Sequence, residues 1–149
     1  MNPTEDRAIL EFDVSGLSET VPLITLDIWF DNIDPEPPVG IIDVFTFIGD
    51  GVVTADDFYA GGPTPFTSFI AENGPEYGYA SIDVTSAVRD VLTANEQFVG
   101  FRLSTETEDR FNMGNMSMLP DPILTVIPEP TTVLLLGLGA LAMRKRILG

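Results

Sequence analysis

The chain has 149 residues, which is room for one domain of ordinary size and a short appendage. Its 7 basic and 23 acidic residues give a formal net charge of −16, and only four of the basic residues precede Pro128. Nucleic-acid binding is excluded because it depends on cations that neutralise phosphates. The sequence contains no Cys and no His. Ser–His or Cys–His catalysis and thiolate or imidazole metal centres are therefore excluded too, and we expect no cofactor.

Residues 1–127 are predicted to form an all-β domain, because β-rich stretches alternate with Gly, Pro, Asn and Asp. The expected strands cover residues 8–14, 22–30, 40–48, 65–71, 77–84, 98–105, 111–118 and 123–127. In the second stretch every other residue is apolar, so one face should lie against the core. That face consists of Ile24, Leu26, Ile28 and Phe30. Short strands at regular spacing predict an antiparallel sandwich.

One stretch, 85–95, is predicted to be helical. Its apolar side chains recur on one face, and these are Ala87, Val88, Val91 and Leu92. Thr85 or Ser86 is expected to cap the helix N-terminus. Residues 49–51, Gly-Asp-Gly, predict a tight turn that requires positive φ.

The tail, residues 128–149, differs from the body in composition. Residues 133–143 form an uncharged apolar run that is expected to be a single hydrophobic helix in the membrane. The residues assigned to this membrane helix are Val133, Leu134, Leu135, Leu136, Leu138 and Leu141. At 1.5 Å per residue the run spans roughly 17 Å, short of a hydrocarbon core of about 30 Å. This length favours a segment that is processed over a permanent anchor, with the basic end, Arg144, Lys145 and Arg146, on the cytoplasmic side.

Pro128, Glu129 and Pro130, then the apolar run, then the basic end, resemble a PEP-CTERM sorting domain over about the last 24 residues. The resemblance implies recognition by an exosortase, an intramembrane cysteine transpeptidase-like enzyme of Gram-negative bacteria that make exopolysaccharide. The alternative is an ordinary C-terminal helix packed on the body. A cationic cluster directly after an apolar run favours the membrane boundary.

The body has a looser resemblance of its own. Residues 7–15, 82–88 and 99–103 are similar, in that order, to segments of DNRLRE-type and carbohydrate-binding-module-like jelly rolls. This resemblance implies a jelly-roll sandwich of a surface protein. Such domains carry further strands and a signal peptide before the Arg7 strand, so we expect the natural start to lie upstream of Met1.

Residues 49–57 invite comparison with a calcium loop, in which Asp50 and Asp57 would be ligands. With Gly51 at the sixth loop position, the third position falls on Ile48, which has no oxygen ligand to offer. A hairpin turn with exposed acids explains the pattern better. We predict no metal site.

Two further groups of side chains are candidates for function. Trp29 lies on the less apolar face of its strand and could form a sugar platform with Tyr59, Tyr77 and Tyr79. Aromatic residues in strands are more often packing residues, so that alternative stays open. Close pairs of carboxylates are inevitable in so acidic a body, and none stands on a motif for glycoside hydrolysis.

The basic residues of the body are few, so Arg7, Arg89 and Arg102 are expected to have structural partners.

Together these patterns predict a non-enzymatic, exported cell-surface or exopolysaccharide-associated protein. The tail would tether it to the inner membrane before it reaches the surface or extracellular matrix of a Gram-negative bacterium. The alternative is a carbohydrate-binding module that acts in the matrix.

Overall fold

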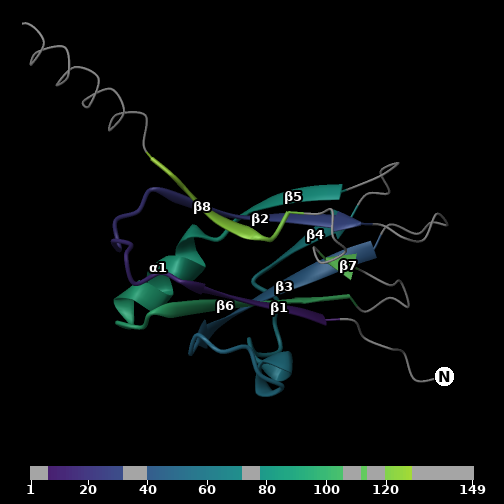
Figure 1. Ribbon diagram of the computed structural model, residues 1–149, viewed down its shortest axis with the longest axis horizontal. Helices are drawn as coiled ribbons and strands as arrows, with labels where there is room; N and C mark the ends of the chain where they lie inside the picture. The colour runs from purple at the N-terminus through teal and green to yellow at the C-terminus, as the bar shows by residue number, and fades with distance from the viewer. Residues whose placement is uncertain (1–6, 32–39, 72–77, 106–111, 114–119, 129–149) are drawn as a thin grey trace, which may run out of the picture.

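The computed structural model describes residues 7–31, 40–71, 78–105, 112–113 and 120–128, which form two sheets and one α-helix (Figure 1). The elements in chain order are β1 (Arg7–Asp13), β2 (Leu23–Asp31), β3 (Gly40–Gly49), the 3-10 helix η1 (Asp56–Tyr59), β4 (Thr67–Ala71), β5 (Gly78–Asp83), α1 (Thr85–Thr93), β6 (Phe98–Ser104), β7 (Asn112–Met113) and β8 (Ile123–Ile127).

Each sheet is built from strands that are distant in the sequence. The first has the order β1-β6-β3-β4, and the second has the order β5-β2-β7, with β8 also paired to β2. Every pairing among the described strands is antiparallel. The prediction of an antiparallel, two-sheet β body with one short helix is therefore confirmed. Strand bounds differ by a few residues, and of the stretch expected at 111–118 the structure describes β7.

The core lies between the two sheets and under α1. On β2, Ile24, Leu26 and Ile28 are fully buried, as the alternation predicted. The side chain of Phe30 lies outside the described residues. Opposite them, Phe101 of β6 is fully buried and makes an edge-to-face contact with Phe12, with 6.0 Å between ring centroids.

The buried face of α1 agrees with its predicted apolar face, but the predicted cap is wrong. The N-cap residue is Val84, which offers no side-chain hydrogen bond. Instead Asp83 accepts hydrogen bonds from the Thr85 amide (2.9 Å) and hydroxyl (2.6 Å). The Thr85 hydroxyl oxygen in turn accepts from the Ile24 amide at 2.9 Å, so it ties the helix start to β2. The Thr85 side-chain and backbone hydrogen bonds hold the pKa of Asp83 below its usual value.

The connection between β3 and β4 covers the outer face of the first sheet (Figure 1). The prediction of a hairpin turn at 49–51 is wrong. The chain does turn there, with Gly51 at φ 87°, but β4 pairs only with residues 40–44 of β3. Residues 50–66 therefore fold back over the sheet, and at Gly61 an added Cβ would lie 2.7 Å from that of Phe45. This cover explains why Phe45 and Arg102 are buried although they point away from the core.

The three described arginines have structural partners, as expected. The Arg7 guanidinium donates to the carbonyl of Phe58 in η1 and lies 4.3 Å from the centroid of that ring. Arg102 lies 3.9 Å from the centroid of the Phe45 ring. Arg89 of α1 donates to the Val21 carbonyl at 3.2 Å from Nε.

Candidate functional site

The outer face of the second sheet carries a polar and aromatic group of side chains. On β2, Asp27 and Trp29 point away from the core because they alternate with buried apolar residues. The strand register places Ser81 of β5 opposite Asp27, and Tyr79 opposite Trp29. On the other side, β8 places Thr125 opposite Thr25.

Asp27 is the centre of this group, and its side chain is only 8% exposed. Its Oδ1 accepts hydrogen bonds from the Ser81 hydroxyl at 2.6 Å and the Tyr79 hydroxyl at 3.0 Å. Its Oδ2 accepts from the Thr125 hydroxyl at 2.6 Å, and the Thr25 hydroxyl lies 3.4 Å away. One carboxylate thus accepts hydrogen bonds from hydroxyl groups on three strands, β2, β5 and β8.

The hydroxyl groups keep this carboxylate ionised. Burial acts to raise the pKa of Asp27, but the hydrogen bonds from Ser81, Thr125 and Tyr79 outweigh it and lower the pKa. An ionised carboxylate can only accept, so each of these hydroxyls uses its single proton on Asp27. The lone pairs of the hydroxyl oxygens remain available, and Ser81 is exposed to solvent.

Trp29 and Tyr79 form an aromatic pair beside Asp27. Their ring centroids are 5.2 Å apart and the ring planes are tilted by 47°. Tyr79 is 56% exposed, and Trp29 is partly buried. Because the Tyr79 hydroxyl is bound to Asp27 and its ring contacts Trp29, the sheet holds the pair in one orientation.

The structure brings together two of the four aromatic residues proposed for a sugar platform. Tyr59 does not join them, because it lies in η1 outside the first sheet, where its ring contacts Phe58. Tyr77 lies outside the described residues. Asp27 could not be recognised from the sequence, because its hydroxyl donors are brought together only by the strand register.

The two acidic side chains that were compared with calcium ligands accept hydrogen bonds from residues of their own loop. Asp50 accepts a hydrogen bond from the Val52 amide at 2.9 Å. Asp57 accepts from the Thr54 amide at 2.6 Å and from its hydroxyl at 3.0 Å, next to the start of η1. Among the described residues no cluster of three or more acidic side chains is placed to hold a metal ion. The absence of a metal site stays a prediction.

Calcium titration of the full chain by calorimetry tests that prediction. We expect weak uptake that moderate salt suppresses, because the attraction is that of a polyanion. Stoichiometric heat that Asp57→Ala abolishes would contradict it.

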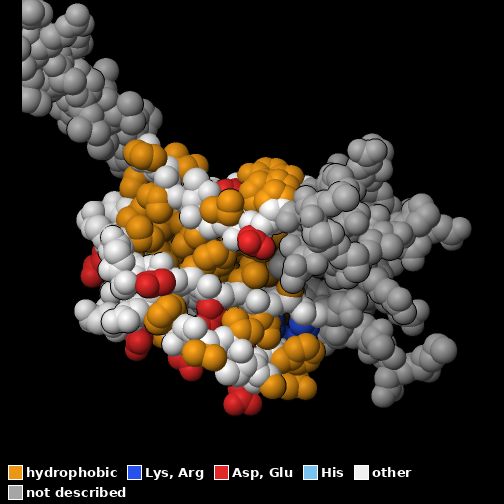
Figure 2. Space-filling view, viewed as in Figure 1, with side chains coloured by type: hydrophobic (Ala, Val, Ile, Leu, Met, Phe, Trp, Pro, Cys, Tyr) orange, Lys and Arg blue, Asp and Glu red, His pale blue; other side chains and the backbone are white. Residues whose placement is uncertain are grey.

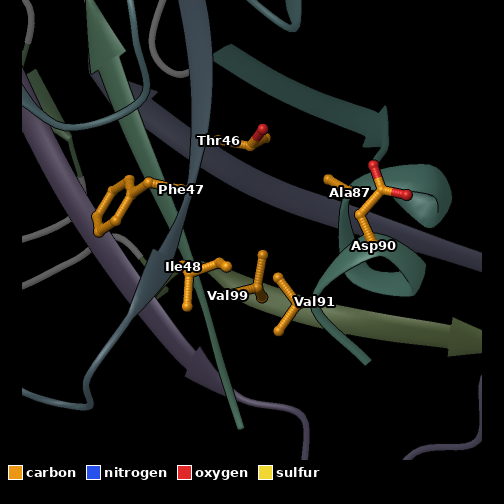
Figure 3. Close-up of a pocket in the computed structure, with 7 residues that line it drawn as sticks. All are labelled: Thr46, Phe47, Ile48, Ala87, Asp90, Val91 and Val99. Carbon is orange, nitrogen blue, oxygen red and sulfur yellow. The ribbon is translucent and has the colours of Figure 1, made fainter. Parts of the chain in front are cut away.

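A hollow between β3, β6 and α1 is a weaker candidate (Figure 3). It measures about 180 Å³, below the few hundred Å³ typical of ligand pockets. Apolar side chains such as Ile48, Val91 and Val99 line it, and Asp90 of α1 stands on one side. It is better explained as a packing hollow at the helix–sheet contact.

A second apolar surface lies where the edge strands β1 and β8 approach each other. Its lining includes Phe12, Leu17, Ile123, Leu124 and Val126. Figure 2 shows apolar side chains gathered along β8 and in the seam below it, with acidic side chains scattered around them. This seam continues the core to the surface at the strand that leads into the tail.

The predicted sorting residues lie at and beyond the end of β8. Pro128 is exposed and directly follows β8. Glu129 and Pro130, the membrane-helix residues 133–141 and the basic end 144–146 lie outside the described residues. Within the described part of the chain, no helix has the length and apolar character needed to cross a membrane.

Comparison with known protein families identifies a sorting motif at the end of the body and in the tail. The model of the PEP-CTERM protein-sorting motif matches residues 126–146. No curated protein matches the chain significantly. The motif implies an exported protein that is tethered to the membrane before release and is processed by an exosortase. The chain therefore joins a two-sheet β body to a C-terminal PEP-CTERM sorting signal.

Proposed function

We propose that this chain is a non-enzymatic protein of the cell surface or exopolysaccharide matrix, delivered there by its tail. The sorting motif carries this proposal. It begins at Val126, inside β8, where the backbone pairs with Ile24 of the central strand β2. The signal is thus attached directly to the folded body.

The remaining features of the body fit this role. Its acidity opposes nucleic-acid binding and favours solubility outside the cell. The body has two antiparallel sheets, and the proposal takes them to form the jelly-roll sandwich that the resemblance of residues 7–15, 82–88 and 99–103 implies. The apolar run after Pro130 is short for a permanent anchor, which supports tethering at the inner membrane followed by processing.

Replacing Glu129 by Ala tests the sorting step. In a host with the cognate exosortase, we expect Glu129→Ala to leave unprocessed chain in the membrane, because the Pro-Glu-Pro segment of the motif loses its one charged residue. Glu96→Ala is the matched control, since Glu96 is an exposed acid of the body. The readout is the mass of the surface product from each strain.

Two outcomes would contradict this role for the tail. One is a mature wild-type product that still contains residues 131–149. The other is equal processing of the wild type and Glu129→Ala.

A carbohydrate-binding module is the second candidate function, and one specific observation favours it. The partly exposed Trp29–Tyr79 pair lies beside oriented hydroxyl groups on an outer sheet face. Aromatic faces next to fixed polar groups are typical of small-ligand sites.

A further inference from the structure

We infer that the outer face of the β5-β2-β8 sheet binds a neutral polysaccharide, with the Trp29–Tyr79 pair as the stacking surface and the Asp27-bound hydroxyls as acceptors. The inference deepens the second candidate function and rests on it. It does not depend on how the tail is sorted.

The direction of the hydrogen bonds at Asp27 determines which groups a ligand must offer. Because Ser81 and Thr125 donate their protons to Asp27, their oxygens face a ligand as acceptors. A ligand here must therefore supply donors. Sugar hydroxyls do so, whereas a carboxylate, sulfate or phosphate group offers acceptors only.

The charge of the body determines whether the ligand is neutral or anionic. A body with 22 acidic residues repels polyanions. The described cations are engaged elsewhere, since Arg7 contacts η1, Arg89 binds the Val21 carbonyl and Arg102 lies over Phe45. An uncharged glycan fits both the hydrogen-bond directions and the charge of the body.

The arrangement of these side chains along β2 and β5 suits a sugar ring. Residues two apart on a strand share a face and lie roughly 7 Å apart. Tyr79 and Ser81 on β5, and Trp29 and Asp27 on β2, therefore place the aromatic surface and the acceptors next to each other on one face. A pyranose presents an apolar C–H face and a rim of hydroxyls, which match these two parts.

The network also fixes the site before a ligand arrives. The Tyr79 hydroxyl is held by Asp27, and the ring is held against Trp29. A side chain that is already ordered loses less conformational entropy on binding.

The test uses the full chain in mild detergent and affinity electrophoresis in gels that contain dextran, galactomannan, a mixed-linkage β-glucan or alginate. We expect retardation by at least one of the neutral polymers and none by alginate. Trp29→Ala and Tyr79→Ala should each weaken that retardation about tenfold or more, the effect typical of a central aromatic contact.

Tyr59→Ala is the matched control. Tyr59 is exposed and belongs to another aromatic pair, with the half-buried Phe58 at a centroid distance of 5.1 Å, in η1 outside the first sheet. The Tyr59→Ala variant should bind the neutral polymer as tightly as the wild type does. Trp29 is the single tryptophan of the chain, so the bound neutral polymer should also shift its fluorescence and shield it from acrylamide.

Circular dichroism of each variant separates lost binding from lost folding. The inference is overturned if no neutral polymer retards the chain, if alginate binds best, or if folded Trp29→Ala and Tyr79→Ala bind as tightly as Tyr59→Ala. Tail processing is measured by mass in cells, so a failure of the sorting proposal would be seen separately.

Discussion

Replacing Phe101 by Ala is expected to lower the free energy of unfolding by about 3–5 kcal/mol. Phe101 is completely buried in the central part of β6 and contacts Phe12 edge to face. Truncation removes the buried ring and leaves a cavity that the two flanking strands, β1 and β3, cannot close. Since domains are stable by about 5–15 kcal/mol, this variant should be close to unfolding at moderate temperature.

Urea titration followed by Trp29 fluorescence measures this change, because the chain has a single tryptophan. Ile70→Ala is the control. Ile70 is 59% exposed on the edge strand β4, so its loss should change stability by about 0.5 kcal/mol or less. Equal stability of the two variants would mean that the core does not lie between the sheets as described.

Local patterns predicted most of the strands because the hydrophobic alternation is a local property of the chain. The face of β2 with Ile24, Leu26 and Ile28 could be recognised from nine residues alone. The buried face of α1 was recognisable for the same reason. Which strands become neighbours depends on contacts between segments far apart in the sequence, such as β1 beside β6. Hydrophobic periodicity alone does not specify these contacts.

The cover of the first sheet shows where the alternation misleads. β3 carries apolar side chains on both faces, and residues 50–66 cover the part of its outer face where Phe45 is buried. A strand that is covered on both faces has a nearly continuous apolar sequence, and this sequence does not indicate what covers the strand. The sequence therefore indicated burial without indicating that a loop provides it, and a tight hairpin was the wrong expectation.

The candidate site was predictable only in part. Trp29 stood out because it interrupts the polar face of its strand, and its partner Tyr79 was one of three candidate tyrosines. Asp27 was not recognised because one acidic residue among 23 does not stand out in the sequence. Its hydroxyl donors come from residues 52 and 54 positions away on β5 and 98 positions away on β8.

Replacing Asp27 by Asn is expected to lower the free energy of unfolding at neutral pH by about 1.5–3 kcal/mol, the range for hydrogen bonds to a charged group. In the wild type the hydroxyls share the two carboxylate oxygens of Asp27. The Asn side chain has one acceptor oxygen, so some of these hydroxyls must lose their hydrogen bond. Asp90→Asn is the matched control, because Asp90 is exposed on α1 and should change stability by about 0.5 kcal/mol or less.

The deficit of Asp27→Asn should also depend on pH. Folding lowers the pKa of Asp27, so the folded state holds the carboxylate ionised below the ordinary value of about 3.9. Its stabilising effect is therefore complete above that ordinary value and is lost as the pH falls through the lower, folded pKa. Urea titrations of the wild type and the variant should differ most at neutral pH and converge as the pH falls well below about 4. A deficit that stays constant down to that acidity would show that the ionised carboxylate does not organise the hydroxyls of this face.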